Sequence, residues 1–392
     1  MANVLRCPVI TEHEGELVVL SKGYHRELGG LLILEGEEPK KMSMEMAKKW
    51  LLWTVDELAF QTPADKSRAL AARITPALKL GNLIAGSTPF DVMEADQPQA
   101  GKGFSHNITA RIYNERAYLV QQRNGGVGST DESFAAGLMS GQPFICWDNI
   151  RGRLVSQYLE SVMTAPGLVA ARIPGCKEAL IDPRRHIIQL TSNEMESTPD
   201  LAKRSSICRI LKQPGRVFSD IPAMVTKKQA LVLGAVFTLV REWHRQGKLR
   251  TDENRHDFHE WCQILDWIVQ NLLRQAPLMD GHQDAQSRVS SPERTWLRAV
   301  ATALEITGRL DVALTATGLA EACQSHAVEI PGTGGVKDVG ATARVIGGLM
   351  RRLFGAGDQL SIEGFTVKRT VKEYRKQSGD KDSTHAYLFE VL

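Results

Sequence analysis

Residues 89–104 read PFDVMEADQPQAGKGF and combine an apolar run with a Gly-Lys turn. Its apolar run from Phe90 to Ala95 predicts a strand, and the run from Ser105 to Asn114 that follows is compatible with a helix. A glycine turn at the start of a helix, with a lysine beside it, directs backbone N–H groups and an ammonium group toward a phosphate. The stretch therefore predicts a phosphate-binding loop made of Pro98, Gln99, Ala100, Gly101, Lys102, Gly103 and Phe104.

This loop departs at two positions from the full pattern G-x-x-x-x-G-K-[ST]. Asp96 stands where the first glycine is expected, and Gly103 stands where a Ser or Thr would hold magnesium. Ser105, one turn further on, could reach a metal instead. The loop alone leaves its assignment to phosphate binding open. The polar residues at the ends of the following strands provide further evidence.

A second strand is predicted at residues 141–149, which read GQPFICWDN. A short apolar run bounded by Gly and Pro is typical of a buried strand in a parallel sheet. Ligands of open α/β sheets bind at the carboxyl ends of such strands, which places Asp148 to hold Mg²⁺. The alternative is that Asp148 is a helix cap or a turn residue.

A third strand, residues 184–193, reads RRHIIQLTSN and ends in Asn193. An Asn at this point can orient a water molecule toward the terminal phosphate of a bound nucleotide. Arg204 follows in the segment DLAKRS, residues 200–205. It is a candidate arginine finger for the nucleotide of a neighbouring subunit, and the alternative is a solvated surface charge.

In this order the motifs resemble the superfamily 3 type of AAA+ helicase found in phages, plasmids and mobile genetic islands. The resemblance covers roughly residues 60–215 and is carried by PQAGKG, FICWDN, ARIPGCKEALIDPRRHIIQLTSN and PDLAKRSSICRI. It implies an ATP-dependent replicative DNA helicase of a mobile element that uses ATP and Mg²⁺. It also implies a homo-hexameric ring with single-stranded DNA in its channel, and a primase or polymerase of the same element as a further partner.

Members of that family carry a β-hairpin between the acidic strand and the Asn strand. Here the hairpin would pair residues 168–173 with residues 178–182, turning through Pro174, Gly175, Cys176 and Lys177. Lys177 would present its ammonium group to DNA phosphates in the channel. The alternative is an ordinary surface hairpin with a solvated lysine.

Two positions depart from the family pattern. Gly103 lacks the hydroxyl group expected there, and Asn149 stands where many ATPases carry the glutamate that activates water, so the general base stays unassigned. Two alternatives therefore remain: a DNA-binding replication initiator or loader that uses ATP as a switch without unwinding, and a winged-helix regulator on an inactive ATPase core.

Length and composition agree with a multidomain globular protein. The chain has 392 residues, of which 43% are hydrophobic and 24% are charged, with a net charge of +3. We find no apolar stretch of about 18 residues and no signal pattern, so we expect a cytoplasmic protein without membrane association. The six Cys show no C-x-x-C pair and are expected to be reduced. A charge this small requires any DNA site to be a local patch.

The predicted architecture is α/β with four parts. They are an N-terminal appendage (1–62), an AAA+ P-loop ATPase core (63–215), a helical lid (216–280) with helices at 227–246 and 256–274, and a winged-helix domain (290–392). A polar stretch at 275–292 reads as a linker. In the last part, helices at 293–307, 317–326 and 341–354 precede strands at 360–369 and 386–391. Its basic residues predict contacts with duplex DNA, although winged helices also dock proteins: Arg351, Arg352, Lys368 and Arg369.

Three other patterns imitate functional sites. The segments GGVGST (125–130) and PGTGGVK (331–337) are glycine-rich, but the first lacks a Lys and the second is surrounded by no alternating strands. We interpret both as loops. His256, His259 and Cys262 have a spacing that could gather metal ligands on one helix face, and we interpret them as part of an amphipathic helix.

Overall fold

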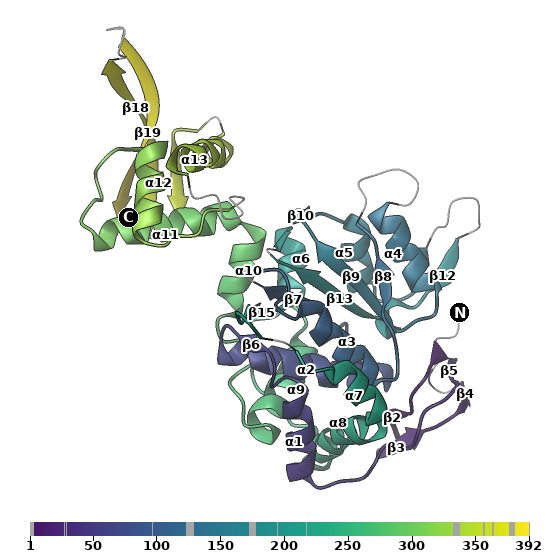
Figure 1. Ribbon diagram of the computed structural model, residues 1–392. Helices are drawn as coiled ribbons and strands as arrows, with labels where there is room; N and C mark the ends of the chain where they lie inside the picture. Colours follow the sequence, from purple (N-terminus) through teal and green to yellow (C-terminus); the bar gives the residue numbers. More distant parts are fainter. Residues whose placement is uncertain are drawn as a thin grey trace. The chain divides into compact units, whose positions relative to one another are not determined.

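The computed structural model shows two compact units, residues 1–289 and residues 290–392 (Figure 1). It describes residues 4–26, 28, 30–95, 97–122, 129–171, 178–193, 195–216, 218–331, 338–355, 357–362, 364–375 and 381–391.

A six-stranded sheet forms the centre of the first unit. Its order is β6 (Ala59–Phe60), β15 (Ser205–Leu211), β7 (Phe90–Ala95), β13 (Ile187–Ser192), β9 (Phe144–Ile150) and β8 (Tyr118–Val120). The short edge strand β6 is antiparallel to β15, and all other neighbours are parallel. The predicted α/β class and the three strands read from the sequence are thereby confirmed.

Both faces of this sheet are covered by helices, which explains why its strands are apolar on both sides. On β7, Phe90 and Val92 join one core cluster, whereas Met93 and Ala95 join the other. The first cluster includes side chains of α4 (Thr130–Met139), α5 (Gln157–Thr164) and α6 (Pro199–Lys203). The second includes α2 (Pro63–Leu80) and α3 (Lys102–Ile112).

Helix α2 leads the chain into the sheet and begins at a capping box. The Thr62 hydroxyl accepts from the Asp65 N–H at 3.1 Å, and the Asp65 carboxylate accepts from the Thr62 N–H at 3.0 Å. Asp65 also accepts from the Arg209 N–H of β15 at 2.9 Å. This bond fixes the start of α2 against β15, the strand beside β7.

The N-terminal segment adds small sheets to the same unit. Strands β1 (Val4–Leu5), β5 (Leu31–Ile33) and β4 (Gly23–His25) form one sheet, and β2 (Val9–His13) pairs with β3 (Glu16–Leu20) in another. Helix α1 (Met44–Trp53) follows a Ser43 cap and packs on α8 (Gln229–Arg245).

Helices α7 (Ile221–Lys227), α8 (Gln229–Arg245) and α9 (His259–Trp267) follow the sheet, and α9 continues into one π-helical turn, Ile268–Leu272. Both long helices predicted for the lid are present, and a role as a lid stays a prediction. His256 precedes α9, so it does not share a helix face with His259 and Cys262. Within the described residues, no single helix is long and apolar enough to span a membrane; the pair α7 and α8, bent by 84°, passes that test by length and composition only.

The predicted linker is partly wrong. Residues His282–Ser290 form helix α10, in which His282 and Val289 are buried. The Ile207 N–H of β15 contacts His282 Nε2 at 3.2 Å, and Val289 joins the core cluster of α4, α5 and α6. This part of the polar stretch is therefore an element of the first unit.

The second unit has its own core. It consists of α11 (Pro292–Ile306), α12 (Ala316–Ser325), α13 (Val339–Phe354) and a sheet in the order β16 (Leu314–Thr315), β19 (Lys381–Val391), β18 (Phe365–Arg375) and β17 (Gln359–Ile362). The three predicted helices are present. The predicted strand at 360–369 instead covers parts of two antiparallel strands, β17 and β18, and β16 lies between α11 and α12. The winged-helix assignment stays a prediction, and the loop at 332–337 lies outside the described residues.

Candidate nucleotide-binding site

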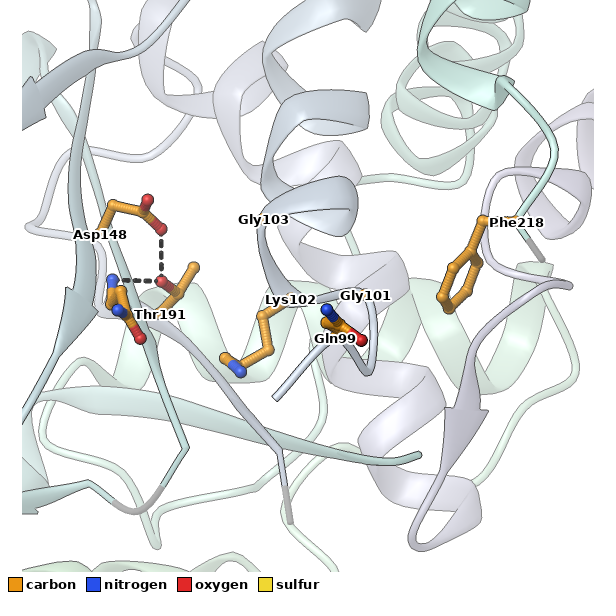
Figure 2. A pocket seen from close by; sticks show the side chains of 8 residues that line it. Gln99, Gly101, Lys102, Gly103, Asp148, Thr191 and Phe218 are labelled. Carbon is orange, nitrogen blue, oxygen red and sulfur yellow. Dashed lines mark hydrogen bonds between the residues drawn. The ribbon is translucent and has the colours of Figure 1, made fainter. Parts of the chain in front are cut away.

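A cavity of about 390 Å³ lies at the carboxyl ends of β7, β9 and β13 (Figure 2). This is the edge of a parallel sheet where α/β proteins bind ligands. The described residues that line it are Gln99, Gly101, Lys102, Gly103, Asp148, Asn149, Thr191 and Phe218. The predicted phosphate loop and the predicted magnesium ligand therefore face one another across one space.

The loop before α3 has a backbone shape that requires glycine at one position. Gly101 is the N-cap of α3 and has φ 104°, in the left-handed region. A Cβ atom there would lie 2.9 Å from Cζ of Phe218 and 3.1 Å from Cδ2 of Leu58. No side chain of the described residues caps α3 at this end, so its first N–H groups stay available to an anion.

Lys102 and Asn193 meet at the ends of two neighbouring strands. The Lys102 Nζ donates to Oδ1 of Asn193, and the Lys102 side chain is largely buried. Strand β13 pairs with β7 in parallel, which brings the residue after β13 beside the loop after β7. The structure thus joins two residues that the sequence assigned to one site from separate motifs.

Thr191 organises the third part of the cavity. Its hydroxyl donates to Oδ1 of Asp148 at 2.6 Å and accepts from the Asn149 N–H at 2.7 Å (Figure 2). Asn149 has φ 53°, a left-handed conformation that Asn adopts more readily than most residues. The buried Thr191 therefore fixes one oxygen of an exposed carboxylate, and the sequence analysis did not single it out.

The donor set partly fits a magnesium ion bound with a nucleotide. The exposed carboxylate of Asp148 is a suitable oxygen ligand. Gly103 offers none, although a Cβ there would meet nothing within 4 Å, so space for a side chain exists. The suggestion that Ser105 substitutes for it is wrong: Ser105 is fully buried, and its hydroxyl accepts from Nη2 of Arg73 at 2.8 Å.

Arg73 itself is buried between α2 and α3. Desolvation by burial lowers the pKa of its guanidinium to about 10, although the Asp91 carboxylate opposes this shift. Its bond to Ser105 holds the first turns of α3 against α2. Ser105 therefore supports the position of the helix that carries Lys102.

Arg204 lies at the amino ends of the parallel strands, opposite the ends that form the cavity. It immediately precedes β15, and its carbonyl accepts from the N–H of Phe90, the first residue of β7, at 3.0 Å. The six residues of β7 span about 20 Å at a typical rise of ~3.3 Å per residue. Arg204 does not line the cavity of its own chain, and its guanidinium contacts the Glu160 carbonyl at 3.4 Å.

The predicted DNA-contacting residues lie in two places. Strands β11 (Val169–Ala171) and β12 (Ala179–Ile181) pair antiparallel, as expected for the hairpin, and Lys177 lies outside the described residues. In the second unit, three cations form ion pairs within that unit: Arg352 with Glu293 at 3.6 Å, Lys368 with Glu390 at 2.6 Å and Arg369 with Asp358 at 2.8 Å. Arg351 is exposed on α13.

Comparison with known proteins gives only distant similarities. No protein-family model matches the chain, and no curated protein matches it. Among solved structures, it is similar to the C-terminal region of NrS-1 (12% identity, TM-score 0.36, covering 77% of this chain and 63% of that one). It is also similar to JCV helicase (12% identity, TM-score 0.32, covering 63% of this chain and 66% of that one). A third similar structure is an SCCmec type IV Cch described as an active helicase (13% identity, TM-score 0.35, covering 98% of this chain and 79% of that one). The chain thus spans about two thirds or less of the length of the first two structures.

Proposed function

We propose that this protein is an ATP-dependent replicative DNA helicase of a mobile genetic element, which forms a hexameric ring and translocates on DNA by ATP hydrolysis. The observation that carries the proposal is the shared cavity, in which Lys102 and Asp148 lie in the wall and Asn193 accepts from Lys102. A cation at the start of α3, a carboxylate at the carboxyl end of β9 and a polar amide directly after β13 are the groups that phosphoryl transfer from a nucleotide requires.

Each residue has a distinct role in this proposal. Lys102 and the N–H groups at the start of α3 hold the phosphates, and Asp148, oriented by Thr191, holds Mg²⁺. The bound metal supplies charge neutralisation for the transferring phosphoryl group. Asn193 orients the attacking water. Arg204 lies far from the cavity of its own chain, so in this proposal its guanidinium contacts the nucleotide bound to an adjacent subunit. Such a contact is made in each subunit of a ring.

Unwinding of a forked duplex tests this proposal directly. We expect the parent protein to separate the strands with ATP, and Lys102→Ala to separate none, because it lacks the cation that faces the phosphates. Lys203→Ala is a matched control, since it removes an exposed lysine of α6 away from the cavity. Absence of ATP-dependent unwinding in the parent would reject the helicase function.

A second function has specific support in two residues of the cavity. Gly103 contributes no metal ligand, and Asn149, which lines the cavity beside Asp148, cannot act as a carboxylate base. Both would slow hydrolysis more than binding. An initiator or loader that binds ATP as a switch is therefore the alternative, and tight ATP binding without turnover would favour it.

A further inference from the structure

We propose that Phe218 forms the nucleobase subsite of the cavity and holds the base by stacking. The proposal rests on the proposed function in that a nucleotide occupies this cavity. Figure 2 shows Phe218 on the side of the cavity away from Asp148, with Lys102 and Gly101 between them. Phe218 is the single aromatic residue among the described residues that line the space.

Contacts of the Phe218 ring and of the next residue hold this segment in place. The Phe218 ring lies 5.0 Å from the Phe104 ring between centroids, with an angle of 38° between their planes. The next residue, Ser219, donates its N–H to Oε2 of Glu57 at 2.9 Å and its hydroxyl to Oε1 of the same carboxylate. Because these bonds tie the segment to residues just before β6, the ring keeps a defined position beside the phosphate loop.

The chemistry of a nucleoside triphosphate matches this arrangement. With its phosphates on Lys102 and the N-terminus of α3, and a metal near Asp148, the sugar and base would extend away from Asp148. Figure 2 shows Phe218 on that side of the cavity. Phe218 is half-buried, so part of its ring remains open for contact. Stacking on an aromatic ring uses the π-face that every base has, so it does not distinguish one base edge from another.

Equilibrium binding of two probes in the presence of Mg²⁺ separates the contribution of the base to affinity from that of the phosphates. ATP carries both, whereas inorganic tripolyphosphate carries only the phosphates. We expect Phe218→Ala to weaken ATP binding on the order of tenfold and to leave tripolyphosphate binding unchanged. The affinity of Phe218→Ala for GTP should fall by the same factor as its affinity for ATP. Phe218→Trp should keep the parent affinity for both nucleotides. Phe258→Ala, which removes another half-buried ring of the same unit, is the matched control and should change neither affinity.

The outcomes distinguish this inference from the proposed function. Unchanged ATP affinity in Phe218→Ala would overturn the stacking role, as would an equal loss of ATP and tripolyphosphate, which indicates a displaced phosphate loop. Lys102→Ala should weaken both probes, because the lysine faces the phosphates. A parent protein that binds neither probe would instead reject the nucleotide site itself, and with it both proposals.

Discussion

Thr191 of β13 connects two neighbouring strands of the central sheet at the wall of the cavity. Its hydroxyl bonds to both Asp148 and Asn149, which lie near the carboxyl end of the neighbouring strand β9. Within a strand a threonine is expected for its β-branched shape, so its polar role becomes visible only once β13 and β9 are paired. One signal was present: Thr191 and Asn193 have the same parity along the strand, so they point to the same face.

Thr191→Val tests this role, because valine keeps the shape and removes the hydroxyl. We expect the Mg²⁺ concentration needed for half-maximal ATP turnover to rise on the order of tenfold, as for loss of a group that orients a metal ligand. Nucleotide binding without metal should stay unchanged. Thr226→Val, which removes a hydroxyl bonded within α7, is the control. An unchanged Mg²⁺ requirement in Thr191→Val would contradict the assignment of Asp148 to the metal.

Arg204→Ala should leave ATP binding nearly intact and reduce turnover by a factor on the order of 10³, because a finger acts on transition-state charge. Mixed rings test its action on a neighbouring subunit. Lys102→Ala subunits keep Arg204, so adding them to Arg204→Ala subunits should restore part of the turnover. No recovery in rings shown to contain both variants would exclude a shared site.

Among the elements, the strands of the central sheet were predictable and helix α10 was not. Strands β7, β9 and β13 are short apolar runs with polar ends, and each such run requires burial on both faces. Helix α10 has few apolar residues, and it is held by contacts of His282 and Val289 with distant parts of the chain. Local composition carries no record of such contacts, so the stretch resembles a linker.

The hairpin of β11 and β12 is the predicted DNA contact of the first unit. If Lys177 contacts DNA phosphates in the channel, Lys177→Ala should keep basal ATP turnover and lose both its stimulation by DNA and strand separation. The loss should be independent of DNA sequence, and the salt dependence of binding should fall by about one contact per engaged subunit. Unwinding at the parent rate would show that the hairpin is not the DNA contact.

Across the whole first unit, buried histidines link stability to pH. His256 is buried, its Nδ1 accepts from the Phe258 N–H at 3.0 Å, and its Nε2 contacts the Ser205 carbonyl at 3.2 Å. Burial lowers the pKa of its imidazole to about 4 from the ordinary value of 6.5. Both ring nitrogens are engaged in the neutral form, so a second proton would break the bond from Phe258.

Between pH 6.5 and pH 4 the unfolded chain therefore binds a proton that folded His256 does not. The free energy of unfolding should rise with pH across this window, with about 3 kcal/mol from His256. Denaturant titrations should show a weaker pH dependence in His256→Gln than in the parent, whereas His13→Gln, at an exposed position, should match the parent. Parallel pH profiles for His256→Gln and the parent would refute this contribution.

In the proposed helicase, one cavity couples ATP hydrolysis to DNA, and steady-state ATP turnover with and without single-stranded DNA is the decisive measurement. We predict sustained turnover that single-stranded DNA accelerates and that Lys102→Ala abolishes. Tight ATP binding without turnover, whether or not DNA is present, would contradict a motor and favour the ATP switch.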